Sequence, residues 1–390
     1  MGPSDRAARF QRTTSHVRTV SSERRRLTSA LPAPRETIAY LHAIGTAHPP
    51  HDVHAAFRAW AGNRVAPRGR PVFERMAARA GIARRWSVLP PLAGAAAEAA
   101  PGAFYAGDPP PGTAARMAIY AEAAPELALR AVAALRAKVE LAGITHLVVA
   151  SCTGFVAPGL DQIVARRLGL SGSVERLLVG FMGCYAAVAA LRSAHHIVRS
   201  EPAARVLVIT CELSTLHLQD DDRAEPLLAQ LQFGDGAAAA LVTGDEGGFR
   251  IERPFAATLP DSEALIRWAI TDRGFAMHLS GEVPRRIAAG LDDADFRAVV
   301  TGGQDVAAID GWAVHAGGRS ILDAVQTSLG LPAHALDASR AVLAANGNMS
   351  SATLMFTLAR LLDGPPVERG VALAFGPGLA AEGFGFGSAT

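Results

Sequence analysis

The chain has 390 residues, of which 49% are hydrophobic and 19% charged, and a formal net charge of +2. This size allows a large core and predicts about two or three domains. No apolar run reaches about 18 residues, which argues against a membrane-spanning helix. The cysteines Cys152, Cys184 and Cys211 are few and widely spaced, so we expect no disulfide framework and a cytoplasmic location. No P-loop, dinucleotide-binding glycine motif or metal-ligand spacing is present.

The first 36 residues carry a charge of their own. It contains eight arginines and the three acidic residues Asp5, Glu23 and Glu36, so its net charge is +5. Residues 37–390 therefore have a net charge of −3. Because this segment has no helical or strand period, we expect a disordered basic tail over residues 1–36. A transit peptide or a nucleic-acid-binding arm is the alternative. Lys138 is the only lysine among many arginines and alanines, a bias typical of a GC-rich bacterial genome.

The middle of the chain reads as alternating strands and helices. Residues 144–154 are a continuous apolar run rich in β-branched residues, as in a buried parallel strand, and an amphipathic helix is predicted over 160–170. A turn at glycine then opens a helix at 183–194, and 205–212 is a second buried strand.

The same order of elements returns downstream. Residues 310–318 predict a strand and 321–331 a helix, and both helices of this kind end on Leu-Gly-Leu. A turn opens a helix at 347–362, and 370–378 is again an apolar strand. Two similar α/β halves are therefore predicted, with chance likeness of ordinary α/β segments as the alternative.

Cys184 lies between Gly183 and a run of small apolar residues. The unpaired N–H groups and partial positive charge of a helix N-terminus favour a thiolate there, and glycine permits close approach of another segment or of a substrate. Cys184 is thus a candidate nucleophile, although a free cysteine is also commonly a small buried hydrophobe.

His315 and Asn348 are the candidate partners of this thiol. His315 ends an apolar strand, and the carboxyl edge of an α/β sheet is where ligands bind. Asn348 lies in a turn before a helix. Taken singly, His315 could be a core histidine and Asn348 a helix cap. If the two halves face one cavity, these residues meet Cys184 and favour a catalytic site.

At these residues the sequence resembles the type III polyketide synthases, the chalcone-synthase-like branch of the thiolase fold, over about residues 37–387. The motifs GFMGCYAA, FGDGAAA, WAVHAGGRSIL, GNMSSA and FGPGL occur in the family's order. The resemblance implies a layered αβαβα architecture of two similar halves. Residues 37–250 would carry the nucleophile, and residues 251–390 would carry the histidine and asparagine.

The resemblance also implies the chemistry. Cys184, His315 and Asn348 would be the catalytic triad, and Phe233 the gate between the CoA tunnel and the cavity. The thiolate, stabilised by an imidazolium at His315, would take an acyl group from acyl-CoA. His315 and Asn348 would then stabilise the enolate of decarboxylated malonyl-CoA, which extends the chain before cyclisation. No metal or organic cofactor is required, and the family implies a homodimer.

Several positions depart from the plant members of the family. The second phenylalanine gate is replaced by Met277, and Trp268 stands in place of a glycine floor, or packs in the core. Three further cavity positions that carry hydroxyl residues in plants are Cys152, Ser214 and His217. A narrowed site of this kind predicts pyrone or resorcinol-type products from flexible acyl chains.

The regions expected to bind CoA and a second subunit also differ. Arg75 and Arg79 match two basic residues of the family's CoA-phosphate helix, while Val72 replaces a third; these arginines could equally be solvated helix charges. Ala157 replaces a methionine that reaches into the partner subunit in plant enzymes, and Pro158 is retained.

Two other functions remain open at this point. An initiating β-ketoacyl carrier-protein synthase shares the fold and the triad. A non-catalytic acyl-binding scaffold is the alternative from another class, and the intact triad argues against it.

Overall fold

The structure, a computed structural model, describes residues 37–90, 104–105 and 107–389. The predicted basic tail lies outside these residues. Within the described ranges, no helix combines the length and apolar character needed to cross a bilayer.

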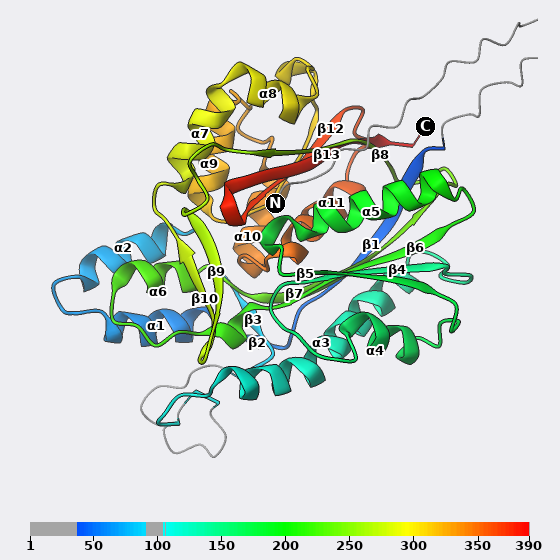
Figure 1. Cartoon of the computed structure of the whole chain (residues 1–390). Coiled ribbons are helices and arrows are strands. Elements are labelled where there is room, and N and C mark those ends of the chain that lie inside the picture. Colours follow the sequence, from blue (N-terminus) through cyan, green and yellow to red (C-terminus); the bar gives the residue numbers. More distant parts are fainter. Residues whose placement is uncertain (1–36, 91–103, 106, 390) are drawn as a thin grey trace, which may run out of the picture. The chain divides into compact units, whose positions relative to one another are not determined.

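Nine strands form one continuous sheet around which the chain is organised (Figure 1). In chain order they are β1 (Ala39–Ala47), β4 (His146–Ser151), β5 (Glu175–Gly180), β6 (Arg205–Leu213), β7 (Asp235–Thr243), β8 (Phe249–Thr258), β11 (Gly311–Val314), β12 (Gly370–Gly376) and β13 (Ala380–Ser388). Their order across the sheet is β11-β12-β13-β8-β1-β7-β6-β4-β5.

The sheet contains the same succession of strand pairings twice. In the first half β4 pairs with β6 in parallel, and β6–β7 and β7–β1 are antiparallel. In the second half β11 pairs with β12 in parallel, and β12–β13 and β13–β8 are antiparallel. The predicted repeat is thus present in the topology. Strands β1 and β8 pair with each other and join the two halves.

Helices α5 (Ala186–Ser200) and α11 (Ser351–Leu362) lie between the two parts of this sheet (Figure 1). Both contact strands of the first and of the second half. Alanines dominate the buried face of α5, so the strands on either side approach the helix closely.

Other helices cover the outer faces and complete the layers. Helices α3 (Thr113–Arg136) and α4 (Leu160–Arg167) pack on the first half, and α7 (Val283–Asp292), α8 (Ala294–Thr301) and α9 (Arg319–Ser328) on the second. The result is the thiolase-type αβαβα arrangement predicted from the sequence.

The remaining elements lie outside the nine-stranded sheet. They are the helices α1 (His54–Arg64), α2 (Arg70–Arg79), α6 (Ala224–Gln230) and α10 (Asp337–Asn346), the strand pairs β2 (His51–Asp52) with β3 (Trp86–Ser87) and β9 (Ile266–Thr271) with β10 (Gly274–Leu279), and the 3-10 turns η1 (Gly183–Tyr185), η2 (Ser214–His217), η3 (Val306–Ala308) and η4 (Pro377–Leu379).

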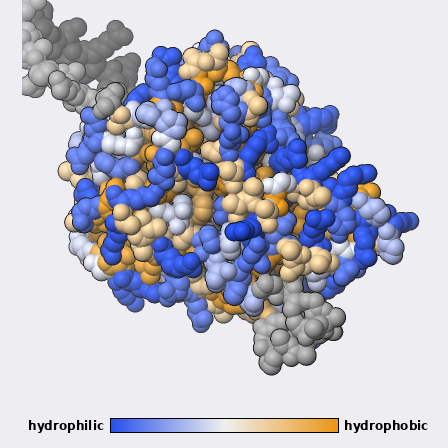
Figure 2. All heavy atoms as spheres, turned by 180° about the vertical axis from the view of Figure 1, so that it is seen from behind, coloured by the Kyte–Doolittle hydropathy of each residue, from blue (hydrophilic) through white to orange (hydrophobic). Residues whose placement is uncertain are grey.

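The surface mixes polar and apolar side chains. Over the face in Figure 2 the two kinds alternate in small groups, and hydrophilic residues dominate the rim. Elsewhere Leu177 and Leu178, neighbours on the edge strand β5, are 42% and 43% exposed. Lys138, just beyond α3, pairs with Asp363 at the end of α11, with an N–O distance of 3.1 Å.

Candidate active site

Cys184 lies in the 3-10 turn η1, directly before α5, and its side chain is buried. The preceding Gly183 has φ +78°, and a Cβ there would lie 2.4 Å from the ring of Pro377. The close approach predicted at this glycine is therefore made by a proline of the second half, which requires that position 183 carry no side chain.

His315 follows β11 directly, at the carboxyl end of the strand as predicted, and is 2% exposed. Its backbone N–H donates to the carbonyl of Leu373 at 2.8 Å, which fixes the backbone. Neither ring nitrogen has a hydrogen-bond partner among the described residues. Buried polar atoms are nearly always paired, so an imidazole with two free nitrogens is available to a ligand.

Asn348 is held on both sides of its amide. Its Nδ2 donates to the carbonyl of Gly317 at 3.2 Å, and its Oδ1 accepts from the backbone N–H of Ser350 at 2.8 Å. Gly317 in turn donates its N–H to the carbonyl of His315. The amide orientation is thereby set, and the remaining Nδ2 hydrogen is directed at the Cys184 sulfur.

The protonation of the thiol and the imidazole is set by burial. Burial raises the pKa of Cys184 to about 11, against the lowering effect of hydrogen bonds with the Ser350 and Asn348 side chains. Burial lowers the pKa of His315 to about 3. The closed site therefore favours a neutral thiol and a neutral imidazole. Desolvation disfavours both charges, so burial acts against the expected imidazolium–thiolate pair, which stays a prediction.

A small cavity of about 20 Å³ adjoins Cys184. It brings together most of the predicted cavity residues: its lining is Cys152, Thr153, Gly183, Cys184, Ser214, Phe233, Trp268, Met277, Ser350 and Pro377. His315 and Asn348 are not among these lining residues. Ser214 has no hydrogen-bond partner for its buried hydroxyl among the described residues, so it too can bind a ligand.

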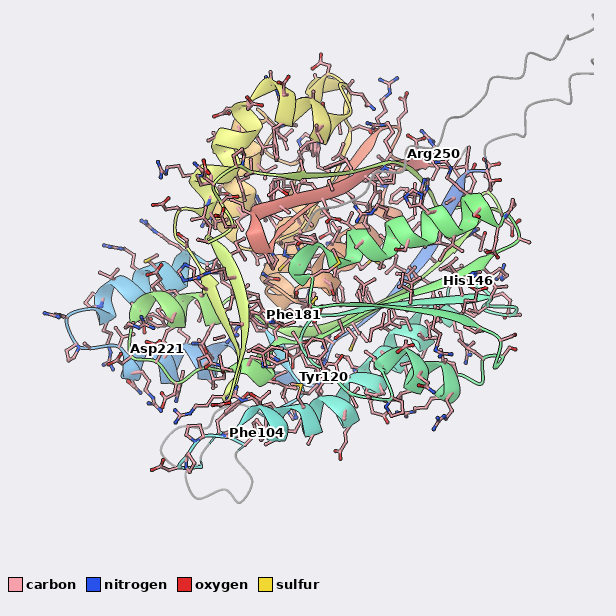
Figure 3. The ribbon with its side chains drawn as sticks, in the orientation of Figure 1. Phe104, Tyr120, His146, Phe181, Asp221 and Arg250 are labelled. Atoms are coloured by element: carbon pink, nitrogen blue, oxygen red, sulfur yellow. The ribbon has the colours of Figure 1, made fainter. Side chains whose placement is uncertain are left out.

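A second cavity of about 440 Å³ lies beyond the first and opens beside α1 and α6. The two share Ser214, Phe233, Trp268 and Met277, which therefore form the partition between them. The larger cavity also has charged lining residues, among them Asp221 on the side formed by α1 and α6 (Figure 3).

The predicted gate Phe233 is tied to the triad through its neighbours. Gln232 accepts from the backbone N–H of Asn348 at 2.7 Å, and Gly234 donates to the Asn348 carbonyl at 2.9 Å. The fully buried Arg85 donates to the carbonyl of Phe233. The gate and the asparagine are therefore positioned by one local backbone arrangement.

His217, Phe275 and Trp268 form an aromatic wall at this partition. His217 stacks on Phe275 with centroids 4.1 Å apart, and Trp268 meets both rings edge-on. The Nε2 of His217 donates to the Thr153 carbonyl at 2.7 Å, and its Nδ1 accepts from the Phe275 N–H at 3.0 Å. Trp268 donates to the Cys152 carbonyl at 3.3 Å. The wall is thus fixed by hydrogen bonds at each polar atom.

A buried carboxylate that the sequence analysis did not single out organises the same region. Glu212, at the end of β6, accepts from the backbone N–H of Cys152 at 2.9 Å and from the hydroxyl of Thr153 at 2.8 Å, and also from the Ser351 hydroxyl. Burial raises its pKa to about 7. An acidic residue closing an apolar strand is a signal that could have identified it.

Phe275 and Ser350 were also missed. Ser350, in the GNMSSA motif, has φ +47°, a strained value for a residue with a side chain. Its hydrogen bond lowers the pKa of Cys184, so the strain lies next to the thiol. The motif pointed to this turn, but no sequence pattern identified Phe275.

Arg75 and Arg79 are not among the lining residues of the cavities described here. Both lie on α2 with exposed side chains. Helix α2 packs on α6, which contributes to the wall of the larger cavity. The two arginines therefore lie outside the cavity on a helix that adjoins its wall, and their role stays a prediction.

The layered fold places this chain among the thiolase-type condensing enzymes. Residues 31–246 match the family model of the chalcone and stilbene synthase N-terminal domain, and residues 251–389 match that of the C-terminal domain. The chain belongs to the chalcone and stilbene synthase family, and it is a type III polyketide synthase, an acyltransferase.

Three similar proteins illustrate the relationship. The alpha-pyrone synthesis polyketide synthase-like Pks18 of Mycobacterium tuberculosis is 34% identical over 286 residues, covering 70% of this chain and 72% of that protein. The structure of PKS-I from the brown alga Ectocarpus siliculosus has a TM-score of 0.81 at 30% identity, covering 91% of this chain and 100% of that one. The 1,3,6,8-tetrahydroxynaphthalene synthase of Streptomyces coelicolor A3(2) has a TM-score of 0.78 at 29% identity, covering 90% and 99%.

Proposed function

We propose that Cys184, His315 and Asn348 condense an acyl-CoA starter with malonyl-CoA, and that the product is a pyrone or a resorcinol-type compound. The two free nitrogens of the buried His315 carry the proposal for the triad. The narrow space beside Cys184 carries the proposal for the product.

The first step is transfer of the starter to the enzyme. The Cys184 sulfur attacks the thioester carbonyl of acyl-CoA while the neutral His315 accepts the thiol proton. CoA leaves and takes up that proton, and the acyl group remains on Cys184. An imidazole must be neutral to accept a proton, and burial favours the neutral form.

The second step forms the carbon nucleophile. Malonyl-CoA loses CO₂, and the enolate that results places negative charge on its thioester oxygen. A ring N–H of His315 and the Asn348 Nδ2 hydrogen, released from Cys184 once the sulfur is acylated, can both donate to that oxygen. The enolate carbon attacks the acyl–Cys184 thioester, so each extension releases one CO₂ and frees Cys184 for reloading.

The wall of His217, Phe275 and Trp268 limits what can occupy the site. Because the space beside Cys184 is only about 20 Å³ and hydrogen bonds fix its wall, we expect a rigid planar starter to be accommodated poorly. Met277, whose unbranched side chain adapts readily, is the flexible member of the partition. A flexible aliphatic chain passing Met277 can extend into the cavity of about 440 Å³. The name of the similar Pks18 protein, which refers to alpha-pyrone synthesis, supports the pyrone.

Mass spectrometry of products from a panel of acyl-CoA starters with malonyl-CoA tests this proposal. We expect pyrone or resorcinol-type products from aliphatic starters and little product from a coumaroyl starter. Trp268→Gly should admit bulkier starters or lengthen the products, and Trp268→Phe, which keeps a ring in the wall, should change them little. An unchanged profile in Trp268→Gly would assign Trp268 to core packing.

Arg75 and Arg79 are proposed to bind the phosphates of CoA. Both are exposed on α2, next to the elements that border the larger cavity. A double change to glutamine should raise KM for malonyl-CoA and leave kcat nearly unchanged. If the double variant and the wild type had equal KM values for malonyl-CoA, these arginines would be solvated helix charges.

A homodimer is proposed on the open edge of the sheet. Strand β5 pairs only with β4 among the described residues, and Leu177 and Leu178 are exposed along it. An exposed apolar edge strand is suited to pairing with the same strand of a second copy. Light scattering should give the mass of a dimer. The double variant Leu177→Lys/Leu178→Lys should shift the measured mass toward that of a monomer. We also place the enzyme in the cytoplasm, where its three free cysteines would stay reduced.

A further inference from the structure

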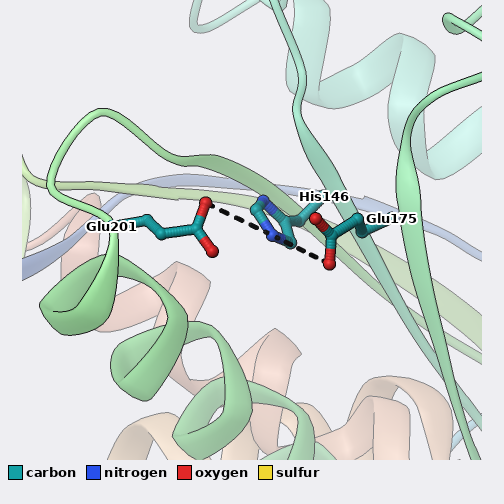
Figure 4. A group of neighbouring side chains, drawn as sticks. All are labelled: His146, Glu175 and Glu201. Atoms are coloured by element: carbon teal, nitrogen blue, oxygen red, sulfur yellow. Dashed lines mark ion pairs between the residues drawn. The ribbon is translucent and has the colours of Figure 1, made fainter.

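His146, Glu175 and Glu201 converge at the sheet edge opposite the candidate active site (Figure 4). His146 begins β4 and Glu175 begins β5, while Glu201 caps the C-terminal end of α5. Cys184 adjoins the other end of α5, and its 15 residues span about 22 Å. The cluster is therefore remote from the condensation chemistry.

The imidazole of His146 is buried and oriented, with its side chain only 8% exposed. Its Nδ1 lies 2.8 Å from the hydroxyl of Thr145. That hydroxyl accepts from the Arg205 N–H at 2.9 Å and can donate to the Arg205 carbonyl at 3.3 Å. Nδ1–H can then donate to the hydroxyl, which leaves the lone pair of Nε2 directed at the two carboxylates, the tautomer that binds a metal.

The spacing of the three ligand atoms suits a cation between them. The Nε2 of His146 lies 3.8 Å from Glu175 Oε2 and 3.9 Å from Glu201 Oε2, beyond hydrogen-bond distance, and all three atoms lie within 4.8 Å of one another. Two ligands of a tetrahedral zinc ion are about 3.4 Å apart. The glutamates are 75% and 59% exposed, so small side-chain rotations would close the difference.

The charge of the cluster is not balanced by a neighbouring arginine or lysine. In the part of the chain that the structure describes, the one ion-pairing partner of Glu175 and of Glu201 is His146. With a neutral imidazole the cluster carries a charge of −2. A divalent cation would neutralise that charge and replace two long contacts by short ones.

We propose that His146, Glu175 and Glu201 bind one divalent transition-metal ion of the zinc class, with water as the fourth ligand. The ion would join the first residues of β4 and β5 to the C-terminal end of α5. No metal motif is visible in the sequence, because successive members of the cluster lie 29 and 26 positions apart, on three separate elements. The condensation reaction does not depend on this site.

Metal binding to the full-length, tag-free protein tests the proposal. After EDTA treatment and dialysis, Zn²⁺ is titrated in competition with a chromogenic zinc indicator. We expect one ion per chain, a raised Tm with zinc, and affinity at least about tenfold weaker in the double variant Glu175→Gln/Glu201→Gln. The control Glu122→Gln/Glu263→Gln, which changes two exposed glutamates elsewhere, should bind as the wild type does.

Cobalt absorption separates this site from binding at the cysteines. Nitrogen and oxygen ligands give visible bands without the sulfur-to-cobalt charge-transfer band of a thiolate. Absence of binding, equal affinity in the double variant, or a thiolate band for the bound ion would overturn the proposal. Because both glutamates are exposed, the double variant should fold, and polyketide formation by it confirms that it has. Loss of polyketide activity in Cys184 variants would leave zinc binding unchanged, so the two proposals fail separately.

Discussion

His217 and His315 are buried on two sides of the same site, and their surroundings are opposite. Burial lowers the pKa of both, to about 4 for His217 and about 3 for His315. His217 uses both ring nitrogens in hydrogen bonds and stacks on Phe275. His315 uses neither nitrogen among the described residues. One ring is part of the wall, and the other is free to bind the reacting group.

The comparison shows how a structural and a reactive residue of the same type can be distinguished. Leaving a buried polar group without a partner costs about 1–3 kcal/mol. His217 avoids that cost, whereas His315 bears it at the carboxyl end of a strand where a ligand can bind. The same distinction between a structural and a reactive residue can be drawn among the three cysteines. Substitution of each residue tests it.

The largest effect is expected at the thiol. Cys184→Ala should abolish starter loading and product formation, since the other sulfurs do not adjoin a helix start. Intact-mass measurement after incubation with acyl-CoA checks this. Cys152→Ala and Cys211→Ala are the matched controls and should still load. Loading of Cys184→Ala to the wild-type extent would refute the assignment.

Asn348→Ala should separate decarboxylation from loading. The enolate charge arises only when malonyl-CoA loses CO₂, so decarboxylation should fall about a hundredfold or more and loading much less. Release of labelled CO₂ and intact mass measure the two steps. If both fell equally, Asn348 would act only by positioning the Phe233 segment.

The reactivity of the thiol with pH tests the neutral pair. With the pKa of Cys184 at about 11 and that of His315 at about 3, the thiolate fraction should rise about tenfold for each pH unit between 7 and 9. The rate of inactivation by iodoacetamide should follow this slope. A plateau beginning near pH 6 would instead show a thiolate–imidazolium pair in the free enzyme.

The smallest expected effect concerns stability. His217→Ala removes two hydrogen bonds and a ring contact, so the free energy of unfolding should fall by about 1–3 kcal/mol more than in His315→Ala. Urea unfolding of both variants gives the difference. Equal losses would mean that the two histidines contribute alike to the fold.

The contribution of His217 to the free energy of unfolding should change with pH in a defined direction. The folded-state pKa of His217 is below the ordinary 6.5, so the unfolded chain binds the extra proton. The stability from neutral His217 is present above pH 6.5 and is lost as the pH falls toward 4. His217→Ala should lose less stability over that range than the wild type.

The sequence predicted the repeat because long apolar strands, a helix-opening glycine and the order of elements are local signals, whereas the layered architecture was implied by the resemblance to a known family. The strands at 205–212 and 370–378 and the turn at Gly183 were found on that basis, and the structure has them as β6, β12 and the close approach to Pro377. His315 was placed correctly at a strand end.

The remaining features depend on contacts between distant residues. Phe275 reaches the site from a hairpin and meets His217, 58 residues earlier, and Glu212 ties together segments of both halves. The shifts in the pKa of Cys184 and of His315 follow from burial by the complete fold. The separation into two cavities depends on side-chain packing, which hydrophobic periodicity does not encode.

Lys138, which pairs with Asp363, gives this chain an unusual chemical property because it is the single lysine. Because Lys138 is the single lysine and its side chain is 38% exposed, an amine-reactive reagent has one internal target. A cross-link between two lysines therefore cannot form within one copy and must join Lys138 of one copy to Lys138 of another. A fluorophore attached there would likewise report one known place, at the junction of α3 and α11.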